Sequence, residues 1–134
     1  MTPARRRAYT VINASSAPVW LAMILAPRSR LTRWLVGRTG VLFVGLGLGY
    51  DALMAAGVAQ GARLDFRDPE AVRRALGEPD VFLAGWAHYI AFDLFVGRWI
   101  WQDAIARGRS ARLALLLTWM AGPAGLSLHL LRNR

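Results

Sequence analysis

The stretch Val81–Trp101, VFLAGWAHYIAFDLFVGRWIW, decides the fold class that we predict for this chain. It is apolar over most of its length, and about 20 such residues in a helix cross the hydrocarbon core of a bilayer. It nevertheless contains His88, Asp93 and Arg98. An ionisable group at bilayer depth is costly unless it is paired or hydrated. We therefore expect at least one of these three residues to be kept for a function.

Three further apolar stretches indicate that the whole chain is a membrane protein. The 134 residues are 55% hydrophobic, with a mean hydropathy of +0.31. The predicted fold is all-α: a single integral, polytopic membrane domain over 1–134, with four transmembrane helices at roughly 10–26, 40–59, 81–101 and 111–131. The first stretch is short and contains Pro18, so a cleaved signal peptide is the alternative interpretation. Because no small-residue cleavage pattern follows it, we prefer a retained helix.

The connections predict one short amphipathic helix and one kink. In the second loop, Asp68 is a typical N-cap and Pro69 suits a first helical turn, while Gly77 is a typical stop. We therefore expect a surface helix at roughly 69–76. In the last apolar stretch, Pro123 removes a backbone hydrogen bond, which predicts a kink.

The positive charge of the chain comes entirely from arginine. There are 17 basic and 8 acidic residues, and the net charge is +9. The arginines lie mostly between the apolar stretches, which favours contact with anionic lipid headgroups over contact with nucleic acid. Slightly more of them fall on the side of both termini, so the positive-inside rule predicts cytoplasmic termini. The absence of cysteine excludes disulfides, thiolate metal sites and cysteine nucleophiles.

The ionisable groups of the third stretch point in three directions if that stretch is one helix. At about 100° per residue, His88 and Asp93 are roughly 140° apart, and Arg98 lies on a third face. Each then needs a partner from elsewhere or a ligand, and we expect Asp51 and His129 to contribute. The ordinary alternatives are Arg98 snorkelling to the interface, Asp93 bonding between helices and His88 bonding in the core.

Other chemistries have less support in the sequence. Neither His88 nor His129 belongs to a paired-histidine or Glu-x-x-His motif, so we predict no metal site. The sequence GLGLGY is not a dinucleotide-binding motif, because Tyr50 occupies the position of the third glycine. We instead expect Gly45 and Gly49 to let another helix approach closely.

The segment Gly85–Gly108, GWAHYIAFDLFVGRWIWQDAIARG, resembles the signature of a known family. Further matching residues are Asn13, Pro18, Trp20, Ala26–Pro27, Asp65–Phe66, Pro69–Glu70, Ala75–Leu76–Gly77, Gly122–Pro123, Gly125 and His129. On these residues the chain is similar to the abscisic-acid-deficient type 4 family, the neoxanthin synthase-like membrane proteins of plastids and many bacteria. Tyr89 and Gly97 match the bacterial members better than the plant members.

The resemblance implies a small four-helix protein of the bacterial cytoplasmic membrane. Plant members are needed to convert violaxanthin into neoxanthin, an isomerisation of a carotenoid epoxide to an allenic alcohol. Because this reaction has no net electron change, it requires no redox cofactor, and we expect none. An acid must protonate the epoxide oxygen and a base must remove a neighbouring proton, and His88 and Asp93 are the candidates for these catalytic roles. The expected binding residues are Trp86, Tyr89, Phe92, Phe95, Arg98, Trp99, Asp51 and His129.

Two other functions are compatible with the sequence. The protein could bind a carotenoid or another isoprenoid, or stabilise a partner complex, without catalysis, its ionisable groups joining helices. It could also relay protons or ions through Asp51, Asp93 and His88, although four helices are few for a transporter unless the chain forms a homo-oligomer. The expected partners are therefore membrane lipid, a carotenoid or other isoprenoid, and a second copy of the chain.

Overall fold

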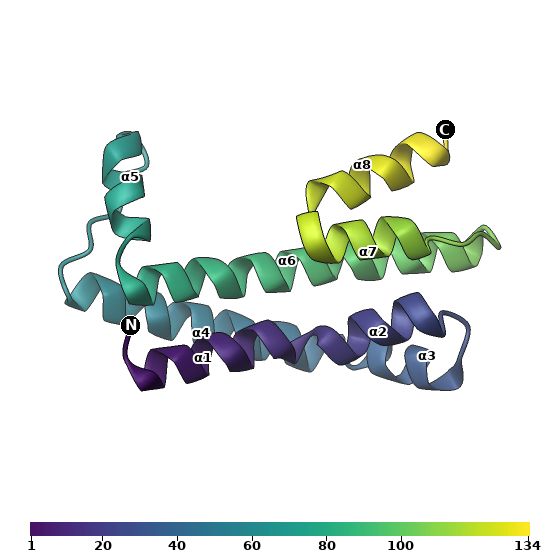
Figure 1. The fold of residues 1–134 in the computed structure, drawn as a ribbon, viewed down its shortest axis with the longest axis horizontal. Helices are drawn as coiled ribbons and strands as arrows, with labels where there is room; N and C mark the ends of the chain where they lie inside the picture. The colour runs from purple at the N-terminus through teal and green to yellow at the C-terminus, as the bar shows by residue number, and fades with distance from the viewer. The chain divides into compact units, whose positions relative to one another are not determined.

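The computed structural model describes all residues from Met1 to Arg134, and they form helices and connections without a strand. The helices are α1 (Pro3–Ser15), α2 (Ala17–Leu25), α3 (Arg30–Gly37), α4 (Thr39–Ala59), α5 (Pro69–Leu76), α6 (Pro79–Ala106), α7 (Arg112–Ala121) and α8 (Pro123–Arg132) (Figure 1). The chain divides into two compact units, residues 1–15 with 43–90 and residues 16–42 with 91–134. Helices α4 and α6 contribute residues to both units.

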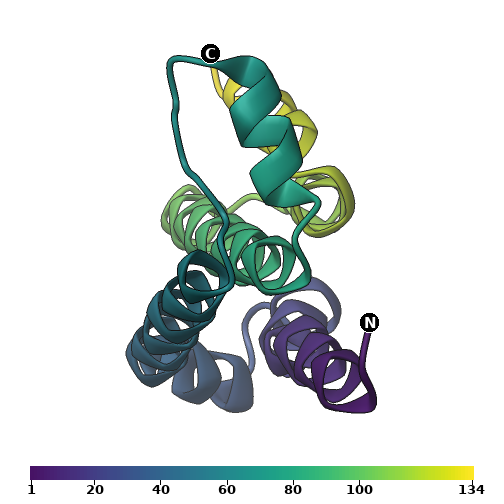
Figure 2. The ribbon, with the colours of Figure 1, turned by 90° about the vertical axis from the view of Figure 1, so that its left-hand side faces the viewer.

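The first unit contains α1, α5 and the adjoining parts of α4 and α6. Helix α5 stands at the start of α6, after the loop that leaves α4 (Figure 2). The side chain of Asp68 caps α5 by accepting a hydrogen bond from the backbone N–H of Glu70, at 3.0 Å. Pro69 occupies the first turn, where its missing N–H costs nothing. The predicted surface helix at 69–76 is confirmed.

Close approach of α4 and α6 in this unit occurs at Gly57. A Cβ atom on Gly57 would lie 2.5 Å from Cγ2 of Val81, so only a glycine fits there without a shift. The prediction that Gly45 and Gly49 let another helix approach closely was wrong for the helices of this chain, because a Cβ atom on either glycine meets nothing within 4 Å. A small residue permits close packing only where the neighbouring helix crosses, and that crossing point is not encoded in the local pattern.

The second unit packs α2, α3, α7, α8 and parts of α4 and α6 around fully buried side chains. Trp20, Met23, Leu94, Ile100 and Leu115 are each at most 2% exposed. The hydroxyl of Thr32 closes the turn between α2 and α3 by donating to the backbone carbonyl of Ala26, at 2.6 Å.

The last apolar stretch forms two short helices rather than one kinked helix. Helix α8 folds back along α7 (Figure 1). The reversal occurs at Gly122, whose φ of +45° and ψ of −99° are accessible to glycine but strained for other residues. Gly125 then allows α8 to contact Thr118 and the backbone carbonyl of Ala114. The prediction of a single helix at 111–131 was therefore wrong, although the break falls at the predicted Gly122–Pro123 position.

The other long helices also differ from their predicted limits. Helical structure in the first stretch begins at Pro3, and it is interrupted at Ser16, two residues before Pro18, which cannot donate a hydrogen bond to the preceding turn. The third stretch continues to Ala106, because the next helix breaker is Gly108.

Two segments, Pro3–Leu25 and Arg30–Ala59, are long and apolar enough to cross a membrane by length and composition. The structure does not show four such spans. Helix α6, which contains Asp80, Asp93, Arg98 and Asp103, is not one of the two segments. Helices α7 and α8 have 10 residues each. At about 1.5 Å per residue, each covers only about half of a 30 Å hydrocarbon core.

Candidate functional site

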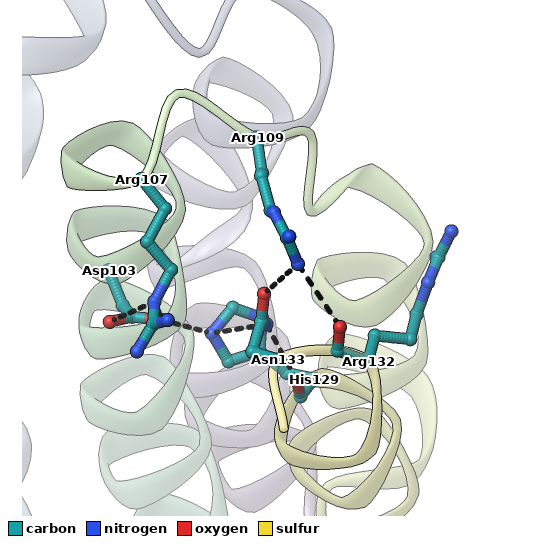
Figure 3. A network of polar contacts seen from close by, with 6 residues as sticks. All are labelled: Asp103, Arg107, Arg109, His129, Arg132 and Asn133. Carbon is teal, nitrogen blue, oxygen red and sulfur yellow. Dashed lines mark hydrogen bonds and ion pairs between the residues drawn. The ribbon is translucent and has the colours of Figure 1, made fainter.

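A carboxylate–imidazole pair joins α6 to α8 in the second unit (Figure 3). The Oδ2 atom of Asp103 lies 2.8 Å from Nε2 of His129, a residue that is only 3% exposed. The side-chain amide nitrogen of Asn133 lies 3.2 Å from the other ring nitrogen. This arrangement fits the imidazole tautomer that carries its proton on Nε2. Because both ring nitrogens are engaged within the chain, the pair holds two helices together rather than presenting a base to a substrate.

Arginines surround this pair. The Nε atom of Arg107 donates to both carboxylate oxygens of Asp103, at 3.0 and 2.9 Å. Hydrogen bonds from Arg107 and then from His129 hold the pKa of the Asp103 carboxyl below its ordinary value. Arg109 donates to Asn133 Oδ1 at 3.0 Å and to the backbone carbonyl of Arg132 at 3.2 Å (Figure 3). This end of the unit therefore carries more positive than negative charge.

Four of the five aromatic side chains of α6 that were predicted to bind a substrate are exposed, and the fifth, Trp86, is half-buried. In the second unit, Phe92, Phe95 and Trp99 have exposed fractions of 61%, 58% and 43%. The ring of Trp99 meets the ring of His129 edge to face, with 5.6 Å between centroids. In the first unit, Tyr89 is 61% exposed. Clustered exposed aromatic residues are typical of contact with lipid or an apolar ligand rather than of core packing.

Asp93 and Arg98 each lie against another element of the second unit. The carboxylate of Asp93 lies at the α7–α8 turn, where a Cβ atom on Gly122 would be 2.9 Å from its Oδ1. The Nη1 atom of Arg98 donates to the hydroxyl of Thr39, at 3.2 Å, and Thr39 is only 1% exposed. Arg98 is therefore held by the first residue of α4.

The predicted residues of the first unit form part of an aromatic cluster. The indole N–H of Trp86 donates to Oδ1 of Asn13, at 3.2 Å. His88 is exposed, and its ring centroid lies 6.3 Å from that of Tyr50 and 6.0 Å from that of Tyr89. The cluster continues through the rings of Tyr9 and Phe82. An imidazole at the surface of such a cluster can exchange protons with an apolar ligand that carries a polar group.

Asp51 and His129 were expected to complete His88, Asp93 and Arg98, and no contact of either residue with these three is observed; His129 instead pairs with Asp103, a residue that was not among them. His129 contacts Asp103 and Trp99, both on α6. Asp51 is exposed on α4 and forms no hydrogen bond or ion pair within the chain. No group of three or more His, Asp and Glu side chains lies together in a way that could hold a metal ion.

A second polar network, in the first unit, has no local signal in the sequence. Arg5 donates to both carboxylate oxygens of Asp80, from Nε at 2.8 Å and from Nη2 at 2.7 Å. Gln60 also donates to this carboxylate, and Asp80 is only 6% exposed. Hydrogen bonding to Arg5 and to Gln60 lowers the pKa of the Asp80 carboxyl against the opposing effect of burial. The network ties α1 and the end of α4 to the start of α6.

The helical architecture, with two segments long and apolar enough to cross a membrane by length and composition, defines a class of small, wholly α-helical proteins. The chain belongs to the ABA DEFICIENT 4-like family, whose family model matches residues 7–129. This match confirms the relationship predicted from Gly85–Gly108, and it spans every candidate residue from Asp51 to His129. No curated protein and no solved structure matches the chain.

Proposed function

We propose that the protein is a multi-pass protein of a bacterial cytoplasmic membrane that binds a carotenoid or a related isoprenoid and isomerises an epoxide of it. The observation that carries the proposal is the exposure of the aromatic side chains of α6, including Phe92, Phe95 and Trp99 in the second unit. A long polyene needs an extended apolar surface, and aromatic faces provide it with little loss of conformational entropy. Membership of the ABA DEFICIENT 4-like family supports the same interpretation.

The proposed reaction needs one acid and one base. Protonation of the epoxide oxygen breaks a C–O bond, and removal of a proton from a neighbouring carbon supplies the electron pair of the new double bond. One proton is added and one is lost, so the product is an isomer of the substrate. We assign these two roles to Asp93 and His88. His88 is supported by its exposure beside Tyr50 and Tyr89, and Asp93 by its position at the α7–α8 turn.

Expression in cells that accumulate an epoxycarotenoid tests the proposal. Wild-type protein should convert the epoxide into an isomer of equal mass, separated by chromatography of the pigment extract. General acid–base groups typically contribute a factor of about 10²–10⁴. Asp93→Asn and His88→Ala should therefore each reduce conversion at least about a hundredfold, at matched protein levels. Glu70→Gln on the surface helix α5 is the control, and its conversion should remain at the wild-type level.

The second candidate, a non-catalytic isoprenoid binder, is favoured by the complete engagement of His129 within the chain. It predicts an unchanged pigment profile together with a carotenoid that co-purifies with the protein. The joint substitution of Phe92 and Phe95 by alanine should then abolish co-purification. A protein that neither converts nor retains any pigment would exclude both functions. Membrane insertion itself is tested separately, by resistance of the protein to extraction with alkaline carbonate.

A further inference from the structure

A cavity of about 570 Å³ opens in the second unit between the end of α2, the end of α6 and the start of α7. Its volume falls within the range of about 300–1,000 Å³ that is usual for small-molecule sites. The lining includes three arginines, Arg28, Arg109 and Arg112, and no acidic residue. None of the residues that line this cavity is a predicted site residue, so the cavity is separate from the exposed aromatic residues of α6.

The positive charge at this cavity is not neutralised by the protein. The side chains of Arg28 and Arg112 are exposed and form no hydrogen bond or ion pair. Arg109 donates to an amide oxygen and to a backbone carbonyl, both of which are uncharged. Three like charges around one cavity repel one another, and a bound anion relieves this repulsion. The cavity is therefore electrostatically suited to an anion.

Part of the lining is apolar. It includes Met23, Trp101 and Leu115, which are 0%, 8% and 2% exposed. The lining also includes Ala111, the cap residue of α7, which has no side chain that could bond to the first-turn N–H groups. Such N–H groups add to the attraction of an anionic oxygen. A lining that combines arginines with buried apolar side chains suits an amphiphile with an anionic head.

We propose that this cavity binds the phosphate group of an anionic phospholipid, with Arg28 and Arg112 contacting the phosphate oxygens and the lipid chain packing against the apolar lining residues. Guanidinium groups bind phosphate through paired, charge-assisted hydrogen bonds. The cavity lies at the α2–α3 and α6–α7 connections, which is where a multi-pass protein meets headgroups. The proposal rests on the proposed membrane location but not on the proposed isomerase reaction.

Native mass spectrometry of the detergent-solubilised protein measures this binding directly. The probes are phosphatidylglycerol, zwitterionic phosphatidylcholine and inorganic phosphate. The test variant is Arg28→Gln with Arg112→Gln. The matched control is Arg30→Gln with Arg38→Gln, which removes the same charge from α3 and its C-cap without touching the cavity lining. All four side chains are exposed, so both variants should fold, which circular dichroism checks.

Wild-type protein should bind phosphatidylglycerol at least about tenfold more tightly than phosphatidylcholine, a difference expected for a site that recognises net negative charge. The test variant should lose this preference, and the control should keep it within about twofold. Equal loss in both variants would show non-specific attraction and overturn the proposal. Inorganic phosphate that displaces the lipid at equal concentration would overturn the assignment to a lipid. A failed membrane location would show itself separately in the carbonate extraction.

Discussion

Replacing Gly97 by alanine tests the packing of the second unit, because the structure leaves no room for a methyl group there. A Cβ atom would lie 2.5 Å from Cζ3 and 3.2 Å from Cζ2 of Trp20, and closer still to Cη2. Carbon atoms in favourable contact lie about 3.5–4.0 Å apart. Trp20 is 1% exposed and stacks on Trp119 with 6.0 Å between ring centroids. The indole therefore cannot yield without displacing its neighbours.

The expected loss follows from two opposing effects. Overpacking of this kind costs about 1–3 kcal/mol. Alanine in place of glycine inside a helix raises the free energy of unfolding by about 0.5–1 kcal/mol. Gly97→Ala should therefore reduce the free energy of unfolding by about 1 kcal/mol at the midpoints of these ranges, and by about 2.5 kcal/mol at most. Gly47→Ala is the control, because a Cβ atom there meets nothing within 4 Å, and it should leave stability unchanged or raise it slightly.

Reversible unfolding by titration with SDS from a mild detergent, followed by far-ultraviolet circular dichroism, measures both effects. A double-mutant cycle adds the decisive comparison. In a Trp20→Leu background the obstructing ring is absent, so Gly97→Ala should cost nothing. Equal stability of Gly97→Ala and Gly47→Ala, or an undiminished cost in the Trp20→Leu background, would refute the reasoning.

Three further predictions use the same unfolding assay. Because its pairing lowers the pKa of Asp80, the folded state gains stability from this carboxylate above its ordinary pKa of 3.8 and loses it as the pH falls below that value. Asp80→Asn should therefore be less stable than wild type at neutral pH, by a margin that shrinks below pH 3.8; a constant margin would argue against the pairing. Gly122→Ala should lose about 1–3 kcal/mol, because φ is +45° and a carboxylate oxygen lies 2.9 Å from the new atom. It should be more damaging than Gly108→Ala, where φ is +63° but the surroundings are open. Trp101→Phe should lose about 0.5–1.5 kcal/mol with the 2.9 Å hydrogen bond to the carbonyl of Pro27, and an unchanged midpoint would show that bond to be unimportant.

Features with a local cause could be predicted from the sequence. The α5 helix is one of them, because Asp68 and Pro69 determine its start through contacts within one turn. The break in the last apolar stretch is another, since it depends on the Gly122–Pro123 pair itself. What could not be predicted there is the direction of the chain after the break. A proline kink and a complete reversal have the same local sequence, and only the backbone angles of Gly122 distinguish them.

Features with a distant cause could not be predicted. Asp103 and His129 are 26 positions apart, and Arg5 and Asp80 are 75 positions apart. Among 17 arginines and 8 acidic residues, many pairings satisfy charge equally well. The choice among them depends on which helix ends meet, and that is determined by the packing of apolar faces. The same limit explains why Gly57, rather than Gly45 or Gly49, is the point of close approach between α4 and α6.

The two histidines have different surroundings, which predict a structural role for His129 and a direct role in conversion or binding for His88. A residue that exchanges a proton with a substrate needs a ring nitrogen that the substrate can reach. His129 is 3% exposed, with Asp103 and Asn133 at its two nitrogens, so its substitution should act through stability. His88, on α6, is exposed beside the rings of Tyr50 on α4 and Tyr89 on α6, so its substitution should act through conversion or binding. Parallel measurement of unfolding and pigment conversion on variants of both histidines therefore distinguishes a helix-joining role from a direct one.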